Sequence, residues 1–428
     1  MGFQPDLSHL LTRAEDLGPV EATLAKLRRL HERHFLFVTA PFGAFSRALA
    51  ARLREEGARC SRVLLNGGDV LDWGLSRARA YFGPLERWKD WLGETVGRER
   101  VTDLILYGDC NPYCAAAKEV AARLGLRTHI FEQGYFRPFW ITLERDGVNA
   151  NSQLRRDPEL YRTPSRVALP AKPVWLAPLT PPAVRRIFAY HVALGLLHPV
   201  FSRYRPPYVY SAHRQMAGHM RHYLIQRLVR RRARRELAQT LAQPGPIFVA
   251  LLQRPGDSQL MRHSPFRSTA DFIRHVAESF AAFAPAEARL IFKSHPLDPG
   301  LEPHARVVAQ AAADAGVGGR VSFVDDGDLN ELLKRVAGVI TINSTSGLTA
   351  LEHGRPTVVL GKAIYDIPGL THQRGLDVFW LSPEAPDEEL FAAFRRLEMA
   401  RTQINGAYAT RRGVELAVPE AARRMLAR

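Results

Sequence analysis

The sequence predicts an α/β protein with two Rossmann-like, doubly wound domains that face each other across a cleft. Short apolar runs alternate with helical patterns in two separate series, one before residue 150 and one after residue 246. The chain of 428 residues also exceeds the usual size of a single hydrophobic core. We therefore expect two parallel sheets, each covered by helices.

The first series predicts an N-terminal domain over residues 1–150. Strands are expected at 35–40, 61–65, 103–107 and 127–131, with helices at 44–57 and 114–124. Polar residues or glycine follow each strand, and ligands of such sheets bind outside the carboxyl ends of the strands. We expect one side of a binding site on this domain.

Residues 151–245 interrupt the alternation and predict a Pro- and Arg-rich connection with helices of its own, at 183–198 and 213–242. Residues 221–235 hold seven arginines and no acid, and their apolar residues are spaced for one stripe of a helix. Such a helix suits an anionic membrane surface. The alternatives are a solvated helix face or a helix that grips an acidic neighbouring domain.

The second series predicts a domain over residues 246–385. Strands are expected at 247–252, 289–292, 321–324, 338–342 and 357–360, with helices at 269–283, 302–315, 329–336 and 347–353. The tail, 386–428, predicts helices that pack back on the N-terminal domain.

Composition narrows the class of protein. The net charge of +16 calls for an anionic partner, but no zinc-finger spacing or RNA-binding aromatic motif supports nucleic acid. No apolar run has the length of a membrane span, and residues 1–18 lack a signal-peptide core, so we expect a cytoplasmic protein. Cys60, Cys110 and Cys114 are too few for a disulfide framework or a zinc site, so we expect free thiols. The sequence has no Walker-A loop, no dinucleotide G-x-G-x-x-G motif and no calcium-loop spacing, so we expect no metal and no cofactor.

The strongest motif joins two strand ends of the second domain. Lys293, Ser294, His295 and Pro296 close one strand with a cation and an imidazole. Asn343, Ser344 and Thr345 close another and precede a helix, whose N-terminus favours anions. Gln253 follows a third strand and faces the same cleft. Together they indicate a site for a phosphate-linked donor. The alternative is an ordinary helix cap with an unrelated loop histidine.

Two further groups lie at strand ends of the first domain. Glu132 follows an apolar strand directly, where a carboxylate suits glycosyl chemistry as base, nucleophile or cation stabiliser. An ion pair between Glu132 and Arg137 is the alternative. Asn66 and Asp69 flank two glycines that leave room for a ligand, although a tight turn capped by the aspartate explains them equally well.

At these positions the chain resembles a known family. The strings FLFVTAPFGAFSRALAARLREEGARCSRVLLNGGDVLDW, FEQGYFRPFWITLERDGVNANS, KSHPLD and TINSTSGLTALEHGRPTVVLGKAIYDIPGLTHQ resemble the bacterial capsule polysaccharide biosynthesis and export proteins of the KpsS (LipA) type. The resemblance runs in order from about residue 33 to about residue 375.

The resemblance implies a GT-B-like glycosyltransferase, peripheral at the inner face of the inner membrane. Relatives transfer Kdo from CMP-Kdo to a phosphatidylglycerol or lyso-phosphatidylglycerol acceptor, which starts a β-Kdo linker for a capsule exported by a transport complex. It implies an acceptor-side domain at 1–150, a donor domain at 246–385, and retention at the anomeric carbon.

The implied roles fall on the residues already named. Glu132 and His295 are the expected catalytic residues. Lys293, Ser294, Pro296, Asn343, Ser344, Thr345 and Gln253 are expected to bind the donor, and Asn66, Asp69 and Arg137 to line the acceptor side. Relatives carry Asp where this chain has Gln133, which moves the catalytic assignment to Glu132. The alternatives are a non-catalytic capsule assembly or export factor, or a transferase for a different nucleotide sugar.

Overall fold

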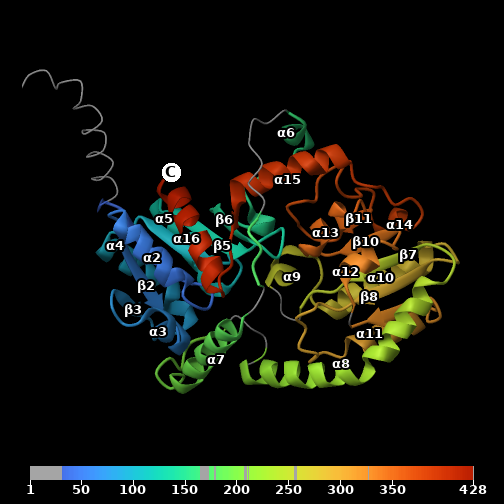
Figure 1. The fold of residues 1–428 in the computed structure, drawn as a ribbon, viewed down its shortest axis with the longest axis horizontal. Coiled ribbons are helices and arrows are strands. Elements are labelled where there is room, and N and C mark those ends of the chain that lie inside the picture. The colour runs from blue at the N-terminus through green and yellow to red at the C-terminus, as the bar shows by residue number, and fades with distance from the viewer. Residues whose placement is uncertain are drawn as a thin grey trace, which may run out of the picture.

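The computed structural model of the protein describes residues 31–163, 173–177, 180–206, 210, 212–254, 258–325 and 327–427. Figure 1 shows two α/β bodies side by side, one built from the first part of the chain and one from the second. The side chains at 228–234, where much of the arginine-rich run falls, lie outside the described part. The α/β fold class predicted from the sequence is confirmed.

The first sheet has seven strands, most of them parallel. In spatial order they are β12 (Gln403–Asn405), β6 (Trp140–Arg145), β5 (Arg127–Gln133), β4 (Asp103–Tyr107), β1 (His34–Phe37), β2 (Arg59–Leu64) and β3 (Ala78–Ala80). Strands β6 and β12 are antiparallel to their neighbours. The parallel part therefore has the doubly wound order, in which the direction of winding reverses at β1.

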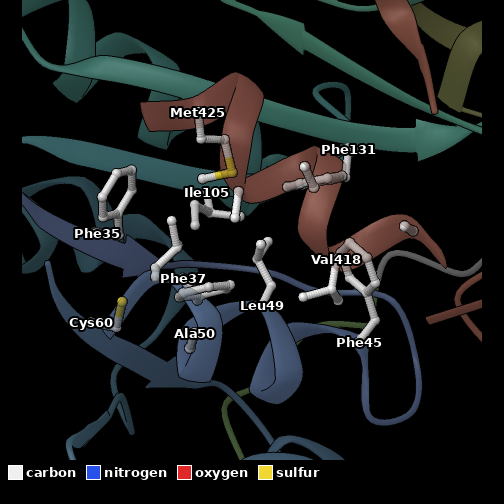
Figure 2. Close-up of a cluster of buried hydrophobic side chains, with 14 of the residues drawn as sticks. Phe35, Phe37, Phe45, Leu49, Ala50, Cys60, Ile105, Phe131, Val418 and Met425 are labelled. Atoms are coloured by element: carbon white, nitrogen blue, oxygen red, sulfur yellow. The ribbon is translucent and has the colours of Figure 1, made fainter. Parts of the chain in front are cut away.

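Helices cover both faces of the first sheet. They are α2 (Phe45–Glu55), α3 (Gly67–Trp73), α4 (Trp88–Glu99), α5 (Pro112–Leu124) and α16 (Arg411–Leu426), with short 3-10 turns at Leu85–Arg87 and Asn149–Asn151. Phe35 and Phe37 of β1 point to one face and pack with α2 and α16, as Figure 2 shows. Leu36 points to the other face, into the cluster that contains α4 and α5. The alternation places two apolar cores around one buried sheet.

The second sheet has five strands, all parallel. Their order is β11 (Thr357–Val359), β10 (Gly338–Thr341), β7 (Ile247–Leu251), β8 (Arg289–Lys293) and β9 (Val321–Val324). The helices of this domain are α9 (Ser258–His263), α10 (Thr269–Phe283), α11 (His304–Asp314), α12 (Leu329–Leu333), α13 (Ser346–Glu352) and α14 (Leu376–Phe379). Winding reverses between β7 and β10, which makes that crossover the expected ligand position.

The connection and the tail tie the two bodies together. The connection holds α6 (Pro158–Arg162), α7 (Pro181–Leu196) and α8 (Ala212–Leu241), and the tail begins with α15 (Glu388–Thr402). One apolar cluster joins Tyr135 and Trp140 of the first body to Leu348 and Tyr365 of the second, with Phe394 of α15 among them. The two domains therefore share a buried apolar core.

The structure adds elements that the sequence pattern did not predict. Strand β5 continues past residue 131 to Gln133, and the segment after it returns as the antiparallel strand β6. Helix α4 lies in a stretch with no predicted element, and the tail contains the short strand β12 between its helices. The three cysteines are free and buried, as expected. Within the described ranges, no helix combines the length and apolarity needed to cross a bilayer.

Candidate functional site

A cavity of about 830 Å³ lies between the two domains, within the volume range of small-molecule sites. Among its lining residues are Asn66, Asp69, Tyr107, Glu132, Gln133 and Arg137 from the first domain, Ile187, Tyr190 and Leu194 from α7, Arg254, His295 and Leu297 from the second domain, and Tyr408 from the tail. The two predicted catalytic residues, Glu132 and His295, therefore meet the predicted acceptor-side residues Asn66, Asp69 and Arg137 in one space.

His295 is the donor-side residue that faces this cavity. It follows β8, and its Nδ1 accepts a hydrogen bond from the backbone N–H of Leu297 at 3.0 Å. The ring proton of the neutral imidazole must then sit on Nε2, which leaves Nε2 as a donor. Burial, and then the positive charges of Arg254 and Arg137, lower the pKa of His295 to about 4. The imidazole is therefore neutral at pH 7 when the cavity is empty.

Three cations influence His295 from different parts of the fold. Arg254 follows β7, Arg137 belongs to the loop after β5 in the first domain, and Lys293 is the last residue of β8. Asp298 opposes them with a negative charge. Positive charges outnumber the negative one around His295, so this arrangement is suited to an anionic ligand.

Glu132 lies on the first-domain side of the cavity, near the end of β5. Its Oε1 accepts the backbone N–H of Gln133 at 2.8 Å, and its backbone carbonyl accepts the hydroxyl of Tyr408 at 2.7 Å. The Gln133 amide donates to the hydroxyl of Tyr107 at 2.9 Å. Arg137 donates from Nε to the carbonyl of Gly134. The tail helps to fix the backbone at Glu132.

Asn66 and Asp69 have structural partners as well as places in the cavity wall. Asn66 caps helix α3, since its Oδ1 accepts the N–H of Asp69 at 3.1 Å. Asp69 forms a buried ion pair with Arg62 at 2.7 Å and accepts the N–H of Leu65. A capped turn is therefore present, but its cap is Asn66 and not the aspartate that the sequence suggested. Tyr190 of α7 also donates to Asn66, so both residues help to hold α7 in place.

The remaining predicted donor residues lie at neighbouring strand ends but outside the cavity lining. Gln253, after β7, donates to Asn343, after β10, at 2.6 Å across the crossover of the second sheet. Ser344 and Thr345 follow Asn343 in the turn before α13. Lys293 and Ser294 are buried, and Pro296 is exposed. The structure therefore does not bring the two hydroxyls into the cavity that His295 lines.

Sequence reasoning missed several cavity residues. Arg254 directly follows Gln253 and was a recognisable signal, because it is a cation at the end of a buried strand. The wall contributed by Ile187, Tyr190 and Leu194 was missed for a different reason. These residues belong to α7, which the sequence placed in a connection between the domains.

A buried polar cluster holds the two domains together beside the cavity. The Cys110 sulfur lies 3.2 Å from Nε2 of His263, a residue of α9 in the second domain. Asn151 lies 3.4 Å from the same nitrogen and donates to Asp109, which also pairs with Lys118 at 2.9 Å. Burial raises the pKa of the Cys110 thiol well above its usual range, so the thiol stays neutral. This cluster has the character of a structural contact.

Comparison with known proteins identifies the family of the chain. A model of the capsule polysaccharide biosynthesis protein family matches residues 102–408. The chain belongs to this family. The matched segment of this capsule polysaccharide biosynthesis protein includes Glu132, Arg137, Arg254 and His295.

Individual relatives cover nearly the whole of this family member. The chain is 33% identical over 384 residues to the capsule polysaccharide export protein KpsS of Escherichia coli, covering 89% of this chain and 97% of that protein. It is 34% identical to the capsule polysaccharide modification protein LipB of Neisseria meningitidis serogroup B, with 87% and 91% covered. A solved structure, the KpsC β-Kdo 2,7 transferase of Thermosulfurimonas dismutans, matches with a TM-score of 0.45, 13% identity and coverage of 92% and 99%. The KpsS-type resemblance inferred from the sequence is thus confirmed.

Proposed function

We propose that this chain is a glycosyltransferase of capsule biosynthesis that transfers Kdo from CMP-Kdo to phosphatidylglycerol or lyso-phosphatidylglycerol. One observation carries the proposal. A neutral histidine, His295, lies among the cations Arg254, Arg137 and Lys293 at a cavity between two doubly wound domains. Membership of the capsule polysaccharide biosynthesis family supplies the pathway in which such a site would act.

The phosphate of the donor is the proposed ligand of His295. Its Nε2–H would donate to a phosphate oxygen, while the surrounding cations stabilise the charge that grows as the sugar leaves. Binding of this anion offsets the positive charges of Arg254 and Arg137, so the pKa of His295 rises from about 4 towards the operating pH. A shift in that direction lets the histidine share its proton with the departing phosphate.

The carboxylate of an acidic sugar explains why more than one arginine is present. A CMP-activated acidic sugar carries one phosphate and one carboxylate, and the guanidinium groups of Arg254 and Arg137 suit both. Because this cationic set can balance a single phosphate, we propose that transfer needs no metal ion. Lys293, Gln253, Asn343, Ser344 and Thr345 remain proposed donor contacts at the adjoining strand ends.

Glu132 is the proposed catalytic carboxylate on the acceptor side. It faces the cavity opposite the second domain, where it can stabilise the sugar cation or accept the proton of the attacking hydroxyl. Gln133 beside it is a neutral amide and cannot take either role. Retention at the anomeric carbon is part of the proposal.

The acceptor is proposed to enter along the apolar part of the cavity. Phe42, Ile187, Leu194 and Tyr190 present carbon surface there, which suits a ligand with a lipid portion. We accordingly propose that the protein works peripherally at the inner face of the inner membrane, close to the capsule export complex.

The test is transfer by the purified full-length chain. CMP-Kdo and a fluorescent phosphatidylglycerol are supplied, and the mass of the lipid is measured by mass spectrometry. We expect this mass to increase by one or more Kdo units. His295→Ala should lower the rate by about 10²–10⁴-fold while the circular dichroism spectrum stays native. His275→Ala is the matched control, since His275 is an exposed residue of α10 in the same domain.

Two outcomes would count against this proposal. Near-normal turnover by His295→Ala would remove histidine from the donor site. A complete absence of sugar transfer from a panel of nucleotide sugars would favour a non-catalytic role in capsule assembly or export instead. Transfer from another nucleotide sugar alone would keep the transferase and replace the donor.

A further inference from the structure

Helix α7 carries an exposed apolar stripe with no counterpart in the proposed chemistry. Val184, Phe188, Val192, Leu196 and Val200 follow one another at intervals of four residues through the helix and the turn after it. Residues at this spacing line one face of a helix. Their side chains are 42–75% exposed, which is unusual for five large apolar residues in a row.

The other face of α7 is fixed to the first domain and lines the cavity. The Tyr190 ring packs on Phe42 with centroids 4.6 Å apart, and its hydroxyl donates to Asn66 at 3.1 Å. Arg186 pairs with Asp72 at 2.9 Å. Ile187 and Leu194 complete this face, and both line the cavity. One helix therefore has the cavity on one side and an exposed apolar stripe on the other.

The positive charge of the chain is concentrated in the stretch of sequence that contains this helix. Residues 160–235 contain 15 Lys and Arg and no Asp or Glu, so they carry nearly all of the net charge of +16. On α8, Arg221 and Arg227 are exposed beside Tyr223 and Leu224, which are also exposed. Figure 1 shows α7 and α8 along the same lower edge of the molecule.

Exposed apolar side chains in a stretch of sequence rich in arginine and free of acids indicate an anionic bilayer as the partner. A bilayer offers hydrocarbon for the stripe and lipid phosphates for the arginines, and each Lys or Arg near such a surface adds to the attraction. The hydrated surface of an acidic protein would pair with the arginines. It would leave the five large apolar side chains against polar groups and water, whereas a bilayer would bury them in hydrocarbon.

We propose that α7 is a membrane-docking helix, whose stripe inserts into the surface of an anionic bilayer and places the cavity beside the lipid headgroups. A helix is about 10 Å across with its side chains. A lipid at the stripe thus reaches the Ile187 and Leu194 wall by passing around a single helix. The route for the acceptor rests on the proposed transferase function, whereas the docking itself does not.

The direct test is binding of the full-length chain to vesicles in a sedimentation assay. One set of vesicles is pure phosphatidylcholine, and the other is an equimolar mixture with phosphatidylglycerol. We expect binding to the mixture and at least about tenfold weaker binding to phosphatidylcholine alone. The α7 variant carries three substitutions in the stripe, Val184→Ser, Phe188→Ser and Val192→Ser. It should bind the mixture at least about tenfold more weakly than the original chain, because the inserted apolar area is lost.

A matched control has three exposed apolar residues changed on other elements. Leu124→Ser, Phe283→Ser and Leu381→Ser remove side chains of similar exposure, and this variant should bind like the original chain. Unchanged binding by the α7 variant would overturn the proposal. A dimer of the original chain that the α7 variant converts to monomer, measured by light scattering, would also overturn it, since the stripe would then pair with a second copy.

Sugar transfer separates this proposal from the function on which its route depends. With phosphatidylglycerol in vesicles the α7 variant should be slow, and with a dispersed short-chain phosphatidylglycerol it should match the original chain. Loss of vesicle binding in the α7 variant, together with no transfer by any protein, would uphold docking and reject the transferase. If the original chain transfers sugar and the α7 variant binds vesicles as tightly as the original chain, docking is rejected and the transferase function stands.

Discussion

Arg254 shows how one side chain can set the chemistry of another. It is the largest charged contributor to the low pKa of His295, after burial itself. It lies at the end of β7, next to Gln253, and lines the cavity. A guanidinium there would bind the donor and, before the donor arrives, keep His295 unprotonated.

We predict that Arg254→Ala weakens use of the donor and changes the titration of His295. The kcat/KM for CMP-Kdo should fall by about 10²-fold or more. Arg254→Lys should recover part of the loss, because lysine restores the positive charge but lacks the paired N–H donors of a guanidinium. In Arg254→Ala the pKa of His295 should rise above about 4, because a nearby positive charge is gone. NMR titration of the imidazole measures that pKa directly.

The control for this experiment is Arg306→Ala, which removes an exposed arginine from α11. It should change neither the kinetics nor the titration. If His295 titrates identically in the original chain and in Arg254→Ala, the electrostatic link between the two residues is wrong, whatever happens to the rate.

At the scale of elements, the contact between α3 and α7 holds one wall of the cavity. A Cβ on Gly68 would lie 2.3 Å from the Tyr190 ring, and one on Gly67 would lie 2.1 Å from the carbonyl of Ala193. The absence of side chains at these two positions therefore allows α7 to lie directly on α3. The space beside them is occupied by α7, where the sequence suggested room for a ligand.

We predict that Gly68→Ala pushes Tyr190 and α7 away from the first domain. The free energy of unfolding should fall by about 1–3 kcal/mol, as for other overpacked contacts. Gly195→Ala is the matched control on the same helix pair, because its Cβ meets nothing within 4 Å. That change should raise the stability by about 0.5–1 kcal/mol, since alanine favours a helix over glycine. Urea unfolding of both variants checks the two signs, and equal stability would contradict the packing account.

Most of the elements could be predicted because their signals are local. The buried parallel strands are continuous apolar runs, and α10 and α11 have clear helical periodicity. The exceptions depend on distant contacts. Strand β12 is three residues long and is defined by pairing with β6, more than 250 residues earlier. Helix α4 contains Gly93 and Gly97, which weaken its helical pattern.

The site was predictable only in part, for the same physical reason. The strand-end residues pointed to the edge of the second sheet that borders the cavity, and Glu132 and His295 do face one cavity. Which strand ends share that cavity depends on how the domains pack. The sequence could not show that α7 forms a wall, or that Ser344 and Thr345 lie outside the lining.

At the scale of the whole molecule, α15 carries the chain from the second domain back to the first. It places the carboxyl of Glu398 in the interior. Glu398 of α15 is fully buried, and Glu144 of β6 is nearly so. Tyr135 donates to Glu144 at 2.7 Å, and Thr402 donates to Glu398 at 2.8 Å. Burial raises the pKa of Glu144 to about 7. Burial, and then the charge of Glu144, raise the pKa of Glu398 well above its usual value.

These two carboxyls make the joined molecule less stable as the pH rises. In the unfolded chain both lose their protons near pH 4.5, whereas the folded chain holds them to higher pH. Between the pKa of each group in the unfolded chain and its pKa in the folded chain, the folded state binds more protons than the unfolded state. The free energy of unfolding therefore falls there by about 1.4 kcal/mol per pH unit for each group. The fall due to Glu144 ends near pH 7, and the fall due to Glu398 ends where that buried carboxyl finally loses its proton.

We predict that Glu398→Gln flattens this dependence, because the amide keeps the Thr402 contact and has no proton to lose. Urea unfolding from pH 5 to pH 9 should show the variant gaining stability relative to the original chain as the pH rises. Glu278→Gln, at an exposed position of α10, serves as the control and should run parallel to the original chain. Parallel curves for Glu398→Gln would mean that the carboxyl already ionises in the folded protein, and that a cation reaches it where α15 joins the two domains.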